Sequence, residues 1–202
     1  MKVLLTGSTG YIGRRLLPLL VNNGHQVVCP VRDKRRFDFE DFSEDFLRNV
    51  DVVEIDFSKE ETLTKLPNDI DAAYYFLHSL TTSSKDFKHL EEVTAYNFNK
   101  YLKKTTARQV IYLGGIVNDT NLSEHLTSRQ RVEDILKESG VPLTVLRSAI
   151  IIGSGGSSFE IIRDLVEKLP VMIAPKWLQS KCQPIGVSNV LDYLMGVLGQ
   201  SK

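Results

Sequence analysis

Glycines recur at every third position near the start of the chain, in the segment 6–13, which reads TGSTGYIG. An apolar run ends just before this segment and a helical pattern begins within it. Because glycine lacks a Cβ, such a turn lets the backbone approach a pyrophosphate, and the unpaired amides of the helix's first turn face the anion. We predict a phosphate-binding turn made of Thr6, Gly7, Ser8, Thr9, Gly10, Tyr11, Ile12 and Gly13.

The residues after the second predicted strand, 26–31, indicate which dinucleotide binds. An acidic residue at this place binds the ribose hydroxyls of NAD, whereas an arginine accommodates the extra phosphate of NADP. Here Arg32 comes directly after the strand and Asp33 comes second. We predict that Arg32 binds the phosphate, so NADP(H) is favoured over NAD(H). For Arg35 and Arg36, a solvated loop explains the sequence equally well.

The ends of other predicted strands supply further candidates, because ligands of doubly wound folds contact the carboxyl ends of strands. Asp56 follows one strand, and either contacts the adenine or caps the next helix. His78 follows another, and either donates a hydrogen bond near the nicotinamide ribose or has a structural role. The remaining candidates at these strand ends are Phe57, Leu77, Ser79, Gly114 and Gly115.

Strands and helices alternate along the chain. This alternation predicts an α/β fold with a doubly wound parallel sheet, the three-layer Rossmann fold, in the strand order 3-2-1-4-5-6, with a short seventh strand as an addition. The predicted strands cover 3–6, 26–31, 52–55, 72–77, 109–113 and 143–146. The predicted helices cover 11–23, 37–48, 59–66, 84–104, 122–139, 158–168 and 187–198.

Three local features refine this prediction. Pro18 lies inside the first helix and predicts a kink. The loop at 154–158, rich in glycine and serine, is either a mobile flap over the nicotinamide or an ordinary linker. A stripe on the helix at 84–104 is expected to belong to the core, not to the cofactor site; it consists of Phe87, Leu90, Thr94, Phe98, Tyr101 and Leu102.

Composition bounds the remaining choices. The chain has 202 residues, of which 42% are hydrophobic and 25% charged, and this favours one domain over residues 1–202. The formal net charge is zero, so charge gives no reason to expect nucleic acid or a membrane as partner. No apolar stretch approaches the about 20 residues of a spanning helix, and we expect a cytoplasmic protein. Cys29 and Cys182 are expected to be buried free thiols, with no metal site.

Five segments and one helix residue carry a family resemblance. The segments are 6–13, 31–33, 71–79, 111–115 and 146–153, and Asn97 matches an asparagine usual in the same family. They resemble the short-chain dehydrogenase/reductase superfamily in its atypical, NmrA-like branch. Its members are usually described as NAD(P)-binding proteins similar to nucleoside-diphosphate-sugar epimerases or to NAD-dependent epimerase/dehydratases. The resemblance implies a Rossmann fold that binds a dinucleotide.

The resemblance breaks at the catalytic positions. Catalytic members of the superfamily carry a tyrosine four residues before a lysine, and the lysine lowers the tyrosine's pKa so that it can transfer a proton. In this chain His125 and Arg129 stand at those positions. Gly114 and Gly115 stand where a catalytic serine is expected. His125 and Arg129 are therefore the candidate catalytic residues, and the ordinary tyrosine–lysine chemistry is not expected.

Two functions follow from this combination. The first is an NADPH-dependent reductase or epimerase for an unidentified small-molecule substrate, with His125 as its acid or base. The second is a non-catalytic sensor that binds NADP(H) and acts through a protein partner. Extended members of the superfamily carry a substrate-binding part after the sixth strand, and here we expect that part to be reduced or missing.

Overall fold

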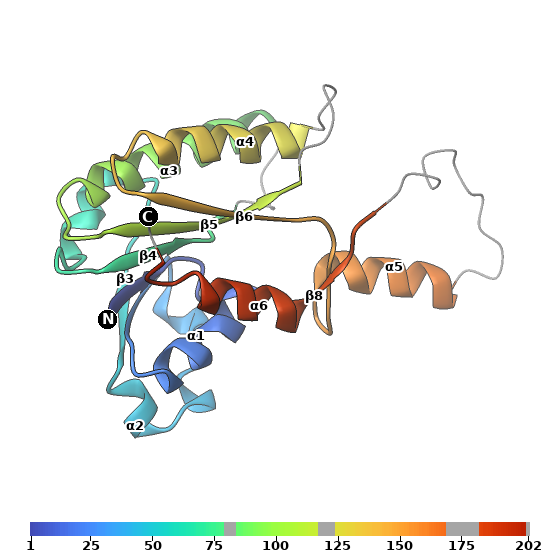
Figure 1. Cartoon of the computed structure of the whole chain (residues 1–202), viewed down its shortest axis with the longest axis horizontal. Coiled ribbons are helices and arrows are strands. Elements are labelled where there is room, and N and C mark those ends of the chain that lie inside the picture. The colour runs from blue at the N-terminus through green and yellow to red at the C-terminus, as the bar shows by residue number, and fades with distance from the viewer. Residues whose placement is uncertain (79–83, 117–123, 169–181, 201–202) are drawn as a thin grey trace.

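The fold is built on a parallel sheet of six strands in the order β3-β2-β1-β4-β5-β6 (Figure 1). The computed structural model describes residues 1–78, 84–116, 124–168 and 182–200. Its strands are β1 (Lys2–Leu5), β2 (Gln26–Val31), β3 (Val50–Glu54), β4 (Ala72–Tyr75), β5 (Gln109–Gly115) and β6 (Leu143–Ser148). The observed order confirms the predicted doubly wound sheet.

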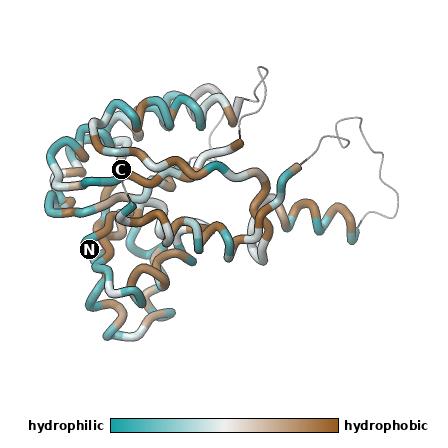
Figure 2. Tube along the Cα trace, viewed as in Figure 1, coloured by the Kyte–Doolittle hydropathy of each residue, from teal (hydrophilic) through white to brown (hydrophobic). Residues whose placement is uncertain are grey.

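Helices cover both faces of this sheet. Figure 1 shows α3 (Ser84–Leu102) and α4 (Glu124–Lys137) on one face, and α1 (Gly13–Asn22) and α6 (Val187–Gly196) on the other. Successive strand residues point to opposite faces, so each face has its own core. Val3 and Leu5 pack with α1 and α6, whereas Leu4 packs with α3 and α4. Apolar residues are accordingly concentrated along the strands in Figure 2.

Two predicted helices have a different form. Residues 37–48 form a 3-10 turn, Phe39–Asp41, and a short helix, α2 (Glu44–Leu47), preceded by another 3-10 turn, Lys34–Arg36. Here the rings of Phe42 and Phe46 stack with centroids 4.4 Å apart. The segment at 59–66 is a 3-10 helix, Glu60–Lys65, in which the Thr62 hydroxyl donates to backbone carbonyls, a bond that competes with regular helix formation.

The first helix continues through Pro18 to Asn22. Proline cannot donate the amide hydrogen bond to the carbonyl of Arg14, but Arg14 is exposed, so water can reach that carbonyl. On the opposite side the helix buries Leu16, Leu17 and Leu20. This packing outweighs the local cost of the proline.

The chain after β6 forms a small second sheet. β7 (Ile151–Ile152) pairs in parallel with β8 (Ile185–Gly186), and α5 (Ser157–Lys168) extends away from the main sheet in Figure 1. The expected short seventh strand exists, but it belongs to this second sheet. Within the described residues, no helix has the length and apolar character needed to cross a bilayer.

The two cysteines differ. Cys29 is completely buried, as predicted, whereas Cys182 is exposed, so its predicted burial was wrong. Cys29 is on a central strand whose side chains enter the core. Cys182 lies just before β8, outside both cores.

Candidate functional site

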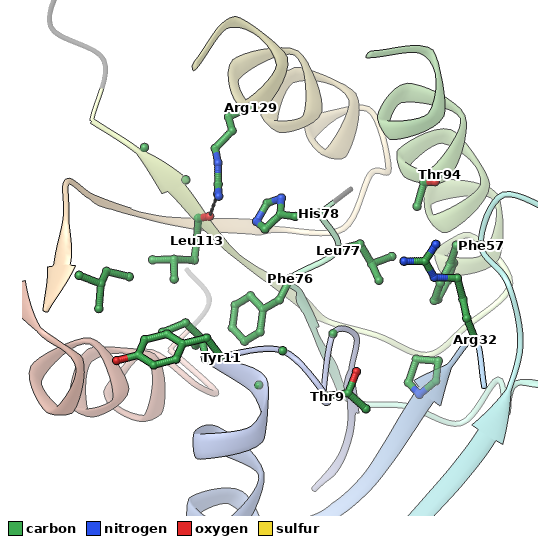
Figure 3. A pocket seen from close by; sticks show the side chains of 18 of the residues that line it. Thr9, Tyr11, Arg32, Phe57, Phe76, Leu77, His78, Thr94, Leu113 and Arg129 are labelled. Atoms are coloured by element: carbon green, nitrogen blue, oxygen red, sulfur yellow. Dashed lines mark hydrogen bonds between the residues drawn. The ribbon is translucent and has the colours of Figure 1, made fainter. Parts of the chain in front are cut away.

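A cavity of about 890 Å³ opens at the carboxyl ends of the strands. This volume is within the usual range of ligand pockets, about 300–1,000 Å³. Figure 3 shows its side chains converging from the strand ends and from the helices around them. The predicted site residues that line it are Gly7, Thr9, Gly10, Tyr11, Ile12, Gly13, Arg32, Asp56, Phe57, Leu77, His78, Gly114, Gly115 and Arg129.

Of the four other predicted residues, the structure describes the side chains of Thr6 and Ser8, and these two are not part of this lining. Thr6 is buried below it, where its hydroxyl donates to the carbonyl of Tyr74 at 2.9 Å and accepts from the amide of Phe76 at 2.9 Å. Ser8 is also buried. Ser79 lies outside the described residues, and His125 lies in α4 with its side chain outside the described part. The catalytic role of His125 therefore stays a prediction.

The glycine turn is closed tightly enough to exclude side chains. Gly7 has a φ of +67°, and a Cβ on it would lie 2.7 Å from the carbonyl oxygen of Phe76. A Cβ on Gly13 would lie 2.2 Å from the carbonyl oxygen of Gly7. The helix that follows has no side-chain cap on Ile12 and no acidic residue in its first turn. This leaves a positive helix end facing the cavity, which fits a pyrophosphate.

One end of the cavity carries positive charge. Arg32 and Arg36 line it beside Asp33. The Arg35 guanidinium holds Asp33 through a contact of 2.7 Å between Nη2 and Oδ2, and these hydrogen bonds lower the pKa of Asp33 to about 2. Asp33 also accepts from the amide of Arg35. The carboxylate of Asp33 is thus already bound to Arg35, while Arg32 and Arg36 line this end of the cavity.

Asp56 lies on the same side of the cavity. Its Oδ1 accepts from the amide of Ser58 at 3.0 Å and from the hydroxyl of Ser58 at 2.8 Å. The N-cap residue of the following 3-10 helix, Glu60–Lys65, is Lys59, which makes no side-chain cap hydrogen bond. Asp56 therefore stabilises a turn, and the helix-cap alternative was wrong.

The other end of the cavity lies where α4 approaches β5. The Arg129 Nη1 donates to the carbonyl of Leu113 at 3.0 Å, drawn as the dashed line in Figure 3. The Tyr112 hydroxyl donates to the carbonyl of Arg129 at 3.1 Å, and burial raises the pKa of Tyr112 to about 12. Arg129 is thus held at the carboxyl end of β5 by two hydrogen bonds.

A buried carboxylate that was not predicted from the sequence lies next to this end. Glu91 on α3 is 4% exposed, and its Oε1 lies 3.7 Å from Nδ1 of His78. Its Oε2 accepts from the Ser128 hydroxyl at 2.5 Å. The signal in the sequence was a glutamate beside the apolar stripe of this helix. Leu90 and Thr94 of that stripe line the cavity, so assigning the whole stripe to the core was wrong.

The stripe is core in its second half, where Phe98, Tyr101 and Leu102 are buried.

The glycine loop at 153–156 packs on Tyr11 of the first turn. Arg15 lies over the Tyr11 ring, 4.1 Å from its centroid, and donates to the carbonyl of Ser154 at 2.7 Å.

A family model described as NAD(P)H-binding matches residues 7–168. The chain belongs to this NAD(P)H-binding family. The match covers the glycine turn, the strand ends and α4, which are the elements that surround the cavity. It confirms the predicted resemblance to NAD(P)-binding proteins, and with it a nicotinamide dinucleotide as the cofactor.

Relatives with known activities cover the whole chain of this NAD(P)H-binding protein. The divinyl chlorophyllide a 8-vinyl-reductase of Arabidopsis thaliana is 25% identical over 217 aligned residues, covering 100% of this chain and 51% of the relative. The same enzyme of Cucumis sativus is 26% identical and covers 99% of this chain and 50% of the relative. The chain therefore spans about half the length of these relatives.

Solved structures share the fold. A nucleoside-diphosphate-sugar epimerase from Staphylococcus aureus superposes with a TM-score of 0.75 at 18% identity, covering 98% of this chain and 66% of the other. A UDP-glucuronic acid 4-epimerase from Bacillus cereus, solved with NAD, gives a TM-score of 0.75 at 18% identity, with 98% and 73% covered.

Proposed function

We propose that this chain binds NADP(H) in the described cavity, in preference to NAD(H), and uses it as a reductase. The observation that carries the preference is the charge at the end of β2. Arg32 and Arg36 line the cavity there, and Arg35 forms an ion pair with the carboxylate of Asp33. The ribose phosphate of NADP(H) can pair with the guanidinium groups of both arginines. The ribose hydroxyl of NAD(H) instead needs a free carboxylate, and the carboxylate of Asp33 is already paired with Arg35.

The rest of the cofactor is expected to follow the strand ends across the cavity. The amides of the glycine turn would hold the pyrophosphate, and the nicotinamide would lie towards His78 and Arg129. When bound, NADPH supplies a hydride for reduction. The reductase name of the curated relatives supports this reaction over epimerisation. The substrate remains an unidentified small molecule.

Replacement of Arg32 by alanine tests the cofactor preference. We expect Arg32→Ala to weaken NADPH binding by about 1.5–3 kcal/mol, which is about 10- to 150-fold in Kd, and to leave NADH nearly unchanged. Arg48→Ala is a control with the same charge change, because Arg48 is exposed and pairs with Asp45 away from the cavity lining. Calorimetric titration measures all the affinities. An equal loss for both cofactors would show that Arg32 does not bind the phosphate.

A second function, an NADP(H) sensor, is favoured by the position of Arg129. Its guanidinium is bound to the carbonyl of Leu113, whereas the lysine that it replaces serves catalysis in the superfamily. A sensor needs different affinities for the oxidised and reduced cofactor, because a ligand shifts an equilibrium only by its differential affinity. NADPH oxidation with ketones, quinones and electron-poor alkenes separates the two functions: turnover supports the reductase, and a clear affinity difference without turnover supports the sensor.

A further inference from the structure

We propose that His78, charged by the buried carboxylate of Glu91, is the proton donor at the nicotinamide end of the cavity. This inference rests on the proposed reductase function and assigns the role that His125 was expected to have. It starts from the burial of Glu91 on α3, which is 4% exposed.

A buried carboxylate is costly unless it is paired, so the groups around it show what it does. The Ser128 hydroxyl donates to Oε2 at 2.5 Å, a bond that favours the ionised form of Glu91. The Nδ1 of His78 lies 3.7 Å from the other carboxylate oxygen, Oε1. This is an ion-pair distance rather than a hydrogen bond, and such contacts commonly shorten when a ligand closes a site.

His78 connects this buried charge to the cavity. Its side chain is 23% exposed and lines the cavity, and Figure 3 shows it at the end of β4 on the same side as Arg129 and Leu113. With a carboxylate beside Nδ1, the ring keeps its proton on that nitrogen. The imidazolium form therefore also carries a proton on Nε2, across the ring from Glu91.

Charged groups of both signs lie near His78. Glu91 Oε1 lies 3.7 Å from Nδ1 of His78, while the cations are Arg129 of α4, which lines the same cavity, and Lys88, one turn before Glu91 on α3. The neighbouring tyrosines, Tyr75 and Tyr112, stay neutral because burial raises the pKa of each. An opposite charge at this distance raises the pKa of a histidine.

The proposed step is a reduction of a C=O or C=C double bond. One atom of the bond gains a hydride, and the other gains the π electron pair together with a proton. The His78 imidazolium gives that proton from Nε2, becomes neutral, and regains a proton from solvent. Bound NADPH would supply the hydride, so the two-electron reduction balances without a further co-reactant.

Titration of the histidines by NMR tests the charging of His78 without cofactor or substrate. The variant Glu91→Gln keeps the size of the side chain and an oxygen that can accept from Ser128, but removes the charge. We expect it to lower the pKa of His78 by about 1–3. His78→Asn assigns the signal, and the exposed His89 on the same helix is the internal control, with an unchanged titration. An unchanged pKa of His78 in Glu91→Gln would overturn the proposal.

Cofactor binding tests the position of His78 in the cavity. This test does not need the Glu91→Gln variant, so it can be done even if that variant fails to fold. A charged His78 disfavours the positive nicotinamide ring of NADP+, so we expect the ratio of the NADP+ and NADPH dissociation constants to rise about fivefold or more between about pH 8 and pH 5.5. In His78→Asn the ratio should be flat, and in His89→Asn it should match the unmodified protein. A pH-independent ratio with tight NADPH binding overturns the proposal and leaves the proposed function intact. Failure to bind NADPH at neutral pH overturns the proposed function itself.

Discussion

At the scale of single residues, burial separates two side chains that the sequence treats alike. Cys29 is completely buried in β2, and burial raises the pKa of its thiol to about 12. Cys182 is exposed. Alkylation and thiol–disulfide exchange need a thiolate that the reagent can reach. The burial of Cys29 and the raised pKa of its thiol therefore both slow its reaction.

We therefore expect one thiol to react in the native protein and two in denaturant. Titration with a chromogenic disulfide at pH 8 measures both numbers. Cys182→Ser should abolish the native reaction, and Cys29→Ser should leave it unchanged. Rapid labelling of both cysteines without denaturant would contradict the burial of Cys29.

The candidate site residues could be predicted only in part. Arg32 and His78 directly follow predicted strands, and the carboxyl ends of parallel strands share one edge, so position along the chain was sufficient. Glu91 could not be found this way. Helical periodicity identifies the buried side of α3, but it does not say which part of that side covers the sheet and which part extends over the cavity. Leu90 and Thr94 are in the second part, and Glu91 is buried next to Leu90.

At the scale of elements, the contact between the first turn and α1 is set by glycine. A Cβ on Gly13 would lie 2.2 Å from the carbonyl oxygen of Gly7, which is backbone and cannot rotate away. By contrast, Gly196 at the end of α6 has nothing within 4 Å of the same atom. The same substitution should therefore have opposite effects at these two helical positions.

We expect Gly13→Ala to destabilise the protein by about 1–3 kcal/mol through overpacking and to weaken NADPH binding, because the turn must open. Gly196→Ala should stabilise it by about 0.5–1 kcal/mol, since alanine loses less backbone entropy in a helix. Urea unfolding gives both free energies. Stability of Gly13→Ala equal to that of the unmodified protein would contradict the close approach.

The elements themselves were predictable where one physical rule dominated. The six strands are apolar runs that end at turn residues, and alternation with helices determines their parallel order. The segment at 37–48 was not predictable in the same way, because its aromatic rings pack on each other as well as on the sheet. Its shape depends on contacts such as that between Phe42 and Phe46, and these contacts do not follow a single helical period.

At the scale of the whole molecule, the cavity is the place where the two cores meet. Its lining includes Ile12 of the face covered by α1 and α6, and Leu77 of the face covered by α3 and α4. A ligand in this cavity contacts both layers across the sheet edge. Unfolding of either layer must therefore release it, so binding is expected to stabilise the complete fold.

NADPH should raise the melting temperature more than NADH does at the same concentration. A ligand at 100 times its Kd stabilises the native state by about 2.7 kcal/mol, which corresponds to about 5–10 °C for a chain of this size. The proposed phosphate contact makes NADH binding weaker, so its shift should be smaller, and the difference should shrink in Arg32→Ala, which keeps only Arg36 at this end of the cavity. Differential scanning fluorimetry measures the shifts, with Arg48→Ala as the control. Equal shifts for the two cofactors in the unmodified protein would show that the arginines after β2 do not select NADPH. A large NADPH shift that is lost in Arg32→Ala but kept in Arg48→Ala would link one residue at a strand end to the stability of both layers.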